Sequence, residues 1–204
     1  MLHYPPLPTE LGDTELGPIL QWVLAVDALK GVDRKTHCLG GTRPENSAEH
    51  SWHIALMALT LSPRIAASGG NPINVIQMLI IHDLVEILVG DTFLYDKASN
   101  QDLVRDEAEA AAEVFGALPE PIGSEILTLW REFEFGKSVD ARIARAIDRL
   151  HPLMMNFASK GKGIPQQSVE TMVNANRAVE QGLPELWPAV VAMLREADSE
   201  GYSL

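Results

Sequence analysis

The sequence contains a single cysteine, Cys38, among its 204 residues. One thiol cannot form a disulfide within the chain, and it cannot supply a zinc site that depends on several cysteines. We therefore expect Cys38 to be a small, half-buried residue rather than a catalytic nucleophile.

Basic residues are also scarce, because 16 Lys and Arg stand against 28 Asp and Glu and give a net charge of −12. Proteins that bind duplex nucleic acid present a basic stripe, and no such stripe is visible in this sequence. We therefore expect no nucleic-acid polymer as a partner. A small phosphorylated metabolite remains compatible with the composition, since it needs only a few local cations and a metal.

The sequence also lacks a targeting segment and a long uninterrupted apolar run. The N-terminus has no basic region followed by an apolar stretch, so no signal peptide is expected. The apolar runs are broken by His, Asp, Glu or Pro before they reach the roughly 18 residues of a membrane helix. We expect no membrane contact and a cytoplasmic location.

Apolar residues recur at helical spacing along most of the chain, and Gly and Pro separate the segments. No alternating strand pattern competes with this periodicity. We predict an all-α, single-domain helical bundle over residues 14–204, preceded by an irregular tail over residues 1–13, with peripheral C-terminal helices from about residue 166. The expected helices cover about 14–30, 47–68, 72–89, 102–118, 122–135 and 139–160, and a loop is expected at 32–46.

The clearest anomaly is a group of ionisable residues inside a very apolar stretch. In IQMLIIHDLVEILVG, ten of the fifteen residues are Ile, Leu, Val or Met, yet the stretch carries His82, Asp83 and Glu86. A helix this apolar is expected to be buried, and burying an unpaired carboxylate costs several kcal/mol. A positive group must therefore face Asp83 and Glu86, either a basic side chain in an internal salt bridge or a cation.

Three further residues favour a cation over an internal salt bridge. His50 lies in the first turns of the preceding helix, which can pack antiparallel against the helix that carries His82. Asp148 rises from a strip of small residues on one face of a later helix, so its carboxylate has room to reach inward. Asp91 follows a glycine that ends its helix, where the chain is expected to open onto a cleft.

His50, His82, Asp83 and Asp148 together offer a mixed set of nitrogen and oxygen ligands. Such a set suits Mn, Fe, Co, Ni or Zn better than Ca, and Mg is also compatible. Four protein ligands leave up to two octahedral positions for water and substrate, and this vacancy distinguishes a catalytic metal from a structural one. We therefore predict that these four side chains hold a metal.

Two stretches of the sequence resemble a known family. Arg43 to Leu59 reads RPENSAEHSWHIALMAL, His82 to Asp91 reads HDLVEILVGD, and Asp148 follows on a later helix. The order of a histidine, an adjacent His-Asp and a distant Asp resembles the HD superfamily of metal-dependent phosphohydrolases, in particular the branch of the 5′-deoxynucleotidases. The resemblance covers roughly Leu16 to Lys160. One departure is Asp148-Arg149-Leu150, where the family usually has Asp-Lys-Leu.

The resemblance implies hydrolysis of a phosphomonoester, most of all a nucleoside or deoxynucleoside 5′-monophosphate, by a homodimeric enzyme. It implies one divalent metal, because the additional histidines of dinuclear relatives are missing between Asp83 and His151. Glu86 would hold the attacking water or move a proton, and Asp91 would protonate the leaving oxygen or hold the sugar. The candidates for binding the phosphate are Arg34, Lys35 and Arg43.

Two other interpretations remain open at this point. A non-catalytic protein of the same fold would bind a nucleotide or a protein partner through a degenerate pocket. An HD hydrolase would alternatively act on a phosphoester that is not a nucleotide. The intact set of candidate ligands, together with Glu86 and Asp91, favours an enzyme over the first alternative.

Overall fold

The computed structural model describes residues 1–92 and 101–204. The first half of the chain contains α1 (Thr9–Gly12), α2 (Gly17–Ala25), η1 (Val26–Gly31), β1 (Asp33–His37), β2 (Pro44–Asn46), α3 (Ser47–Thr60), α4 (Ser62–Ala67), α5 (Pro72–Ile81), η2 (His82–Val85) and α6 (Glu86–Val89). The second half contains α8 (Gln101–Gly116), α9 (Ile122–Phe135), α10 (Val139–Ala158), α11 (Val169–Ala175), α12 (Arg177–Gly182), η3 (Pro184–Leu186) and α13 (Trp187–Ser199). The predicted all-α class is confirmed.

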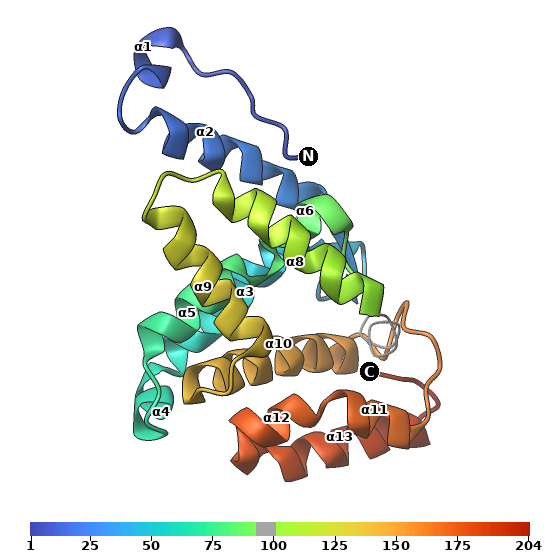
Figure 1. The fold of residues 1–204 in the computed structure, drawn as a ribbon. Helices are drawn as coiled ribbons and strands as arrows, with labels where there is room; N and C mark the ends of the chain where they lie inside the picture. Colours follow the sequence, from blue (N-terminus) through green and yellow to red (C-terminus); the bar gives the residue numbers. More distant parts are fainter. Residues whose placement is uncertain (93–100) are drawn as a thin grey trace.

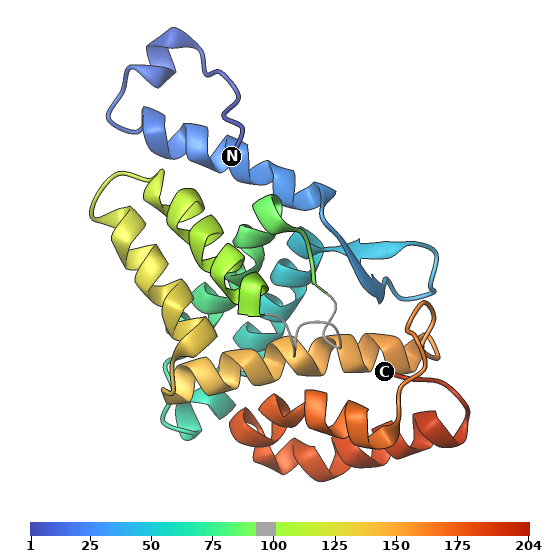
Figure 2. The ribbon, with the colours of Figure 1, turned by 45° about the vertical axis from the view of Figure 1, so that its right-hand side comes forward.

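Helix α10 runs through the middle of the molecule, with α11 to α13 on one side and the helices of the first half on the other (Figures 1 and 2). It begins at Ser138, whose hydroxyl accepts a hydrogen bond from the amide of Ala141. Pro152 lies inside the helix without ending it. One face of α10 is almost entirely buried, so residues on that face are held rigidly by the packing around them.

Two clusters of buried apolar residues hold these layers together. The larger one joins α3, α5 and α10 to the C-terminal helices, through side chains such as Ile54, Leu79, Ile147, Val179 and Leu194. The smaller one lies among η1, η2, α8 and α9 and includes Phe115 and Trp130. The C-terminal helices therefore belong to the main core, and the expectation that they are peripheral is not met.

Local structure differs from the sequence-based expectation in four places. The expected loop 32–46 contains the antiparallel pair β1–β2. The tail 1–13 contains the single turn α1, and its Leu2 is buried. The helix expected over 47–68 begins after Asn46, which forms a capping box with Glu49, and it is interrupted at Leu61.

The helix expected over 72–89 divides into α5, η2 and α6 at the His-Asp pair. The imidazole Nδ1 of His82 lies 3.0 Å from the carbonyl oxygen of Leu79, and the indole Nε1 of Trp130 donates to the carbonyl of His82 over 3.1 Å. Because side chains take up these carbonyl groups, the regular i to i−4 ladder is replaced by a tighter turn. This turn presents His82 and Asp83 together.

The segment Pro72–Val89 has the length and the mean hydropathy, 1.6, of a helix that could cross a membrane. In this fold it supplies Val75, Met78 and Leu79 to the main core, and 44% of it is buried inside the protein. A core helix of this kind is apolar for the same reason that a membrane helix is. Its composition is therefore weak support for a membrane span.

Candidate metal centre

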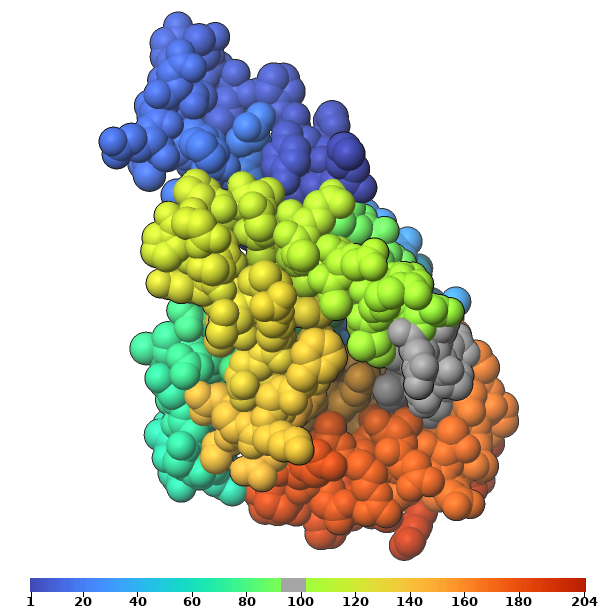
Figure 3. Space-filling view, in the orientation of Figure 1, coloured from blue at the N-terminus to red at the C-terminus, as the bar shows by residue number. Residues whose placement is uncertain are grey.

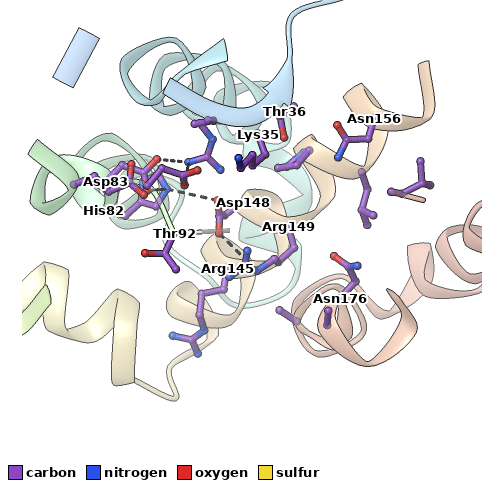
Figure 4. Close-up of a pocket in the computed structure, with 18 of the residues that line it drawn as sticks. Lys35, Thr36, His82, Asp83, Thr92, Arg145, Asp148, Arg149, Asn156 and Asn176 are labelled. Carbon is purple, nitrogen blue, oxygen red and sulfur yellow. Dashed lines mark hydrogen bonds and ion pairs between the residues drawn. The ribbon is translucent and has the colours of Figure 1, made fainter. Parts of the chain in front are cut away.

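Three separate elements bring His50, His82, Asp83 and Asp148 to one buried point. His50 comes from α3. His82 and Asp83 come from η2, and Asp148 comes from α10 (Figure 4). Atom Nε2 of His50 lies 3.0 Å from Oδ1 of Asp148, and Nε2 of His82 lies 3.5 Å from the same oxygen. Donor atoms of His50, His82 and Asp83 all lie within 4.8 Å of one another. The four residues predicted as ligands are thus placed together.

The imidazole ring of His82 is oriented by a hydrogen bond at its outer nitrogen. In His82, Nδ1–H donates to the Leu79 carbonyl, which leaves Nε2 directed at the carboxylates. Although Nε2 of His82 lies only 2.9 Å from Oδ1 of Asp83, the pair lacks hydrogen-bond geometry, and Nε2 has no partner among the described residues. A buried imidazole nitrogen without a partner is costly in a protein core, so this atom fits a metal ligand.

The charges around this point also fit a cation. Burial acts to raise the pKa of Asp83, but the charges of His82 and Arg34 outweigh it and hold the pKa well below its usual value. Burial likewise acts to raise the pKa of Asp148, but the hydrogen bond from His50 and the nearby His82 lower it instead. Both carboxylates therefore stay ionised in the interior. A divalent ion coordinated by two imidazoles and two carboxylates would match this charge and these donor atoms.

Two more acidic groups lie beside the four candidate ligands. The hydroxyl of Ser47 donates a hydrogen bond of 2.6 Å to Oε2 of Glu86. Burial, followed by the charge of Asp83, raises the pKa of Glu86 to about 9. Burial also raises the pKa of Asp91, which faces Arg34 with 3.7 Å between Oδ1 and Nη1. Both acids are thus positioned to hold a proton next to the cluster.

The raised pKa of Glu86 makes the stability of the metal-free protein dependent on pH. A carboxyl group whose pKa is higher in the folded state stabilises the fold fully below its unfolded pKa, and this contribution is lost as the pH rises. We expect the chelated protein to lose thermal stability between pH 4.5 and about 9 through this group, and the Glu86→Gln variant to lose less. Melting curves in chelator across this range test the expectation, which parallel curves for the two proteins would contradict.

The three basic residues predicted to bind phosphate are not equivalent in the structure. Arg34 lies half-buried on β1 and donates a hydrogen bond of 2.8 Å from Nη1 to Oδ2 of Asp83. Lys35 lines the same cleft. Arg43 lies outside it, exposed, and pairs with Glu49 through both of its terminal nitrogens. The bidentate pair stabilises the start of α3 and takes Arg43 away from the cluster.

The candidate metal centre borders a cleft with a volume of about 340 Å³, which His82, Asp83 and Asp148 help to line. The space-filling view shows a hollow between α9 and the C-terminal helices, with α10 at its floor (Figure 3). Polar and charged residues make up most of its lining, and Phe133, Pro152 and Leu153 contribute apolar surface. A cleft of this size accommodates a small organic ligand.

Glu45 was not predicted from the sequence, although it belongs to the centre. It is 3% exposed, and its Oε2 lies 3.4 Å from Nδ1 of His50, while its Oε1 lies 3.9 Å from Nε2 of His151. His151 in turn is 2.9 Å from Nδ1 of His53. The only sequence signal was the position of Glu45 in the RPEN stretch, because a loop residue carries no periodicity that indicates burial.

We expect Glu45 to set the orientation of His50. A carboxylate beside the outer nitrogen of a metal-binding imidazole fixes its tautomer, and loss of such a partner costs about 10–100-fold in metal affinity. Glu45→Gln should therefore weaken metal binding to this extent, as measured by competition with a chromogenic chelator. Asp33→Asn, an exposed change on the neighbouring strand β1, is the control. Equal affinities in wild type and Glu45→Gln would contradict this role.

Comparison with known proteins identifies a matching family and several related proteins. The family described as HD domain matches residues 26–187. The 5′-deoxynucleotidases HDDC2 of Danio rerio and Homo sapiens are 28% and 27% identical to this chain over 137 residues, which is 67% of this chain and 66% and 65% of theirs. The chain thus spans about two thirds of the length of these curated relatives.

Solved structures show the same fold. A predicted metal-dependent phosphohydrolase from Magnetospirillum magnetotacticum is 36% identical, with a TM-score of 0.84 over 97% of this chain and 99% of that one. An HD-domain phosphohydrolase from Listeria innocua has a TM-score of 0.65 over 89% of this chain and 97% of that one. At 18% identity, the second comparison supports the fold alone.

Proposed function

Because this chain belongs to the HD-domain family, we propose that it is a metal-dependent phosphohydrolase that removes phosphate from a nucleoside 5′-monophosphate, above all a deoxynucleotide. The observation that carries the proposal is the convergence of two imidazoles and two carboxylates at the end of a ligand-sized cleft. The likeness to proteins named 5′-deoxynucleotidase supports the choice of substrate.

We propose that His50, His82, Asp83 and Asp148 hold one divalent ion, namely Mn, Co, Fe, Ni, Zn or Mg. When bound, this ion supplies Lewis acidity toward the phosphate oxygens and lowers the pKa of water at the site. In the metal-free arrangement, Nε2–H of His50 donates to Asp148, so metal binding would displace this proton. The ligand set is pre-organised, because each side chain is fixed by burial.

The remaining residues of the cleft have roles that follow from their charge and position. Arg34 and Lys35 neutralise the phosphoryl oxygens, where charge is spread in the transition state. Glu86, held by Ser47, orients the attacking water and accepts a proton from it in its ionised form, which the raised pKa of this group restricts to high pH in the metal-free protein. Asp91, with its raised pKa, protonates the leaving 5′-oxygen.

We expect Arg34 and Arg43 to differ sharply when each is replaced. Arg34→Lys keeps a charge beside Asp83 but loses the planar, forked geometry of the guanidinium, so kcat/KM should fall by about 10–100-fold, equivalent to the loss of one or two charge-assisted hydrogen bonds. Arg43→Lys is the matched control and should leave kcat/KM unchanged, because Arg43 pairs with Glu49 on the surface. Equal effects of the two substitutions would contradict the assignment of Arg34.

A substrate panel tests the function itself. Phosphate release is measured from deoxynucleoside, ribonucleoside and sugar monophosphates, each with Mn, Co or Mg added to the metal-stripped protein. Hydrolysis of the deoxynucleotides supports the proposal. Hydrolysis of sugar phosphates alone would favour a hydrolase of a non-nucleotide phosphoester, and metal binding without any hydrolysis would favour a non-catalytic binding protein.

We propose further that the protein acts in the cytoplasm as a homodimer, with no nucleic-acid polymer or membrane as partner. The net charge of −12 supports the absence of a polyanionic partner. Light scattering coupled to gel filtration distinguishes a dimer from the 22.3 kDa monomer.

A further inference from the structure

The end of the cleft that lies away from the candidate metal centre carries two buried asparagines, Asn156 and Asn176. Asn156 is 4% exposed, and its Oδ1 has no hydrogen-bond partner in the described part of the chain. Asn176 is 1% exposed, and its Nδ2 donates to the carbonyl of Met172 over 2.8 Å. Both residues line the cleft. We call this region, formed by Asn156, Asn176, Pro152 and Leu153, the asparagine end.

A buried amide oxygen without a partner calls for an explanation. Buried polar groups are nearly always hydrogen-bonded, and leaving one unsatisfied costs free energy that a purely structural asparagine would avoid. Asn156 lies on the buried face of α10, where an apolar residue would fill the same space. We therefore interpret its carboxamide as a group that accepts a hydrogen bond from a ligand in the cleft.

The distance between the two ends matches the length of a nucleotide. Asn156 follows Asp148 by eight residues on α10, which is about 12 Å along a helix axis. In the close-up, Asn156 and Asn176 lie on the far side of Arg149 from His82 and Asp83 (Figure 4). A phosphate at the metal centre would thus leave the base of an extended nucleoside monophosphate at the asparagine end.

We propose that the asparagine end is a nucleobase subsite, in which the carboxamides of Asn156 and Asn176 bind the hydrogen-bonding edge of a heterocyclic base. A carboxamide presents an acceptor and two donors side by side, which complements the alternating donors and acceptors of a base edge. Pro152 and Leu153 supply the apolar surface that its flat face requires. This inference rests on the proposed function and specifies the part of the substrate that the protein recognises.

According to the proposal, replacing these two residues weakens recognition of the base and leaves recognition of the phosphate and the sugar unchanged. A site built to hydrogen-bond a ligand loses much of its discrimination when the hydrogen-bonding group is removed. Asn156→Leu keeps the approximate volume of the side chain and removes its carboxamide. We expect kcat/KM for deoxynucleoside monophosphates to fall by about 10–100-fold, the loss of one or two hydrogen bonds in a buried site.

The kinetic experiment compares deoxyadenosine 5′-monophosphate with deoxyribose 5-phosphate, which has the same phosphate and sugar but no base. Asn156→Leu and Asn176→Leu should lower kcat/KM for the nucleotide and leave that for deoxyribose 5-phosphate unchanged. Asn174→Leu, an exposed change on the same helix as Met172, is the control and should change neither. An equal fall for both substrates, or no fall for either, would overturn the proposal.

A binding experiment separates this inference from the proposed activity. Deoxyadenosine, which has no phosphate, is titrated into the metal-free wild-type protein and the Asn156→Leu variant by calorimetry. Binding that the variant weakens supports the subsite, even if phosphate release is never detected. Absence of nucleoside binding to the wild type, or equal binding to both proteins, would overturn the subsite while leaving phosphohydrolase activity intact. Asn156→Ser is smaller and keeps a polar group. It should bind deoxyadenosine with an affinity between those of the wild type and Asn156→Leu, and it replaces the leucine variant if that variant does not fold.

Discussion

Asp83→Ala is expected to lose the bound metal and, with it, all detectable phosphate release. Asp83 is buried between His82 and Arg34, and its two oxygens face these residues, at 2.9 Å from Nε2 of His82 and 2.8 Å from Nη1 of Arg34. Alanine removes one of the four proposed ligands and part of the negative charge that attracts a cation. It also leaves the guanidinium without its nearest counter-charge, so Arg34 would repel the ion that Asp83 now helps to hold.

Metal content measured by elemental analysis after gel filtration tests this expectation directly. Asp198→Ala, which removes an exposed carboxylate from α13, should retain the metal content of the wild type. Circular dichroism on both variants establishes that the helices are intact. Wild-type metal content in Asp83→Ala would contradict the ligand assignment, whatever happens to the activity.

Glu86→Gln is expected to keep the metal and to lose most of its turnover. Glu86 lies beside the four proposed ligands, and its Oε2 is bound by the hydroxyl of Ser47 rather than by one of them. Glutamine keeps the shape and this hydrogen bond but cannot take up a proton, so the variant isolates proton transfer. General acid–base catalysis typically contributes about 10²- to 10⁴-fold, and kcat should fall by that factor with little change in KM.

The comparison of kcat with KM is informative here because a purely structural effect would alter both. Metal content is measured on the same sample, with Glu109→Gln, an exposed change on α8, as the control. The pH dependence of kcat should also lose the ionisation assigned to Glu86. Unchanged kinetics in Glu86→Gln would remove this residue from the mechanism and leave Asp91 as the remaining acid.

The helices and the convergence of the four candidate ligands were predictable because both leave strong local signals. His82 and Asp83 were conspicuous as polar residues in an apolar stretch, and the structure explains this by placing them in the core. Asp148 was indicated by the small residues beside it, which let α10 approach the other helices closely. In each case the unusual residue and the neighbouring residues that indicated its burial lie in one short segment of the sequence.

Other features depend on contacts between distant segments and left no such signal. Glu45 lies on β2 and is buried only because His50 and His151 come from two different helices to meet it. The break of the helix at His82 depends on Trp130, which is 48 residues away in the sequence. The C-terminal helices were expected to be peripheral, since nothing in their own pattern reveals that Val179 and Leu194 join the same buried cluster as the side chains of α10.

The hydrogen bond between His50 and Asp148 joins residues that are 98 positions apart in the chain. Such a contact exists only once α3 and α10 have docked, so an unfolded polypeptide offers the ion no comparable set of ligands. By mass action, any ion that binds there selectively shifts the folding equilibrium toward the native state. The supply of metal would then govern how long the protein survives as well as how fast it works, and scarcity would expose the empty form to unfolding and proteolysis.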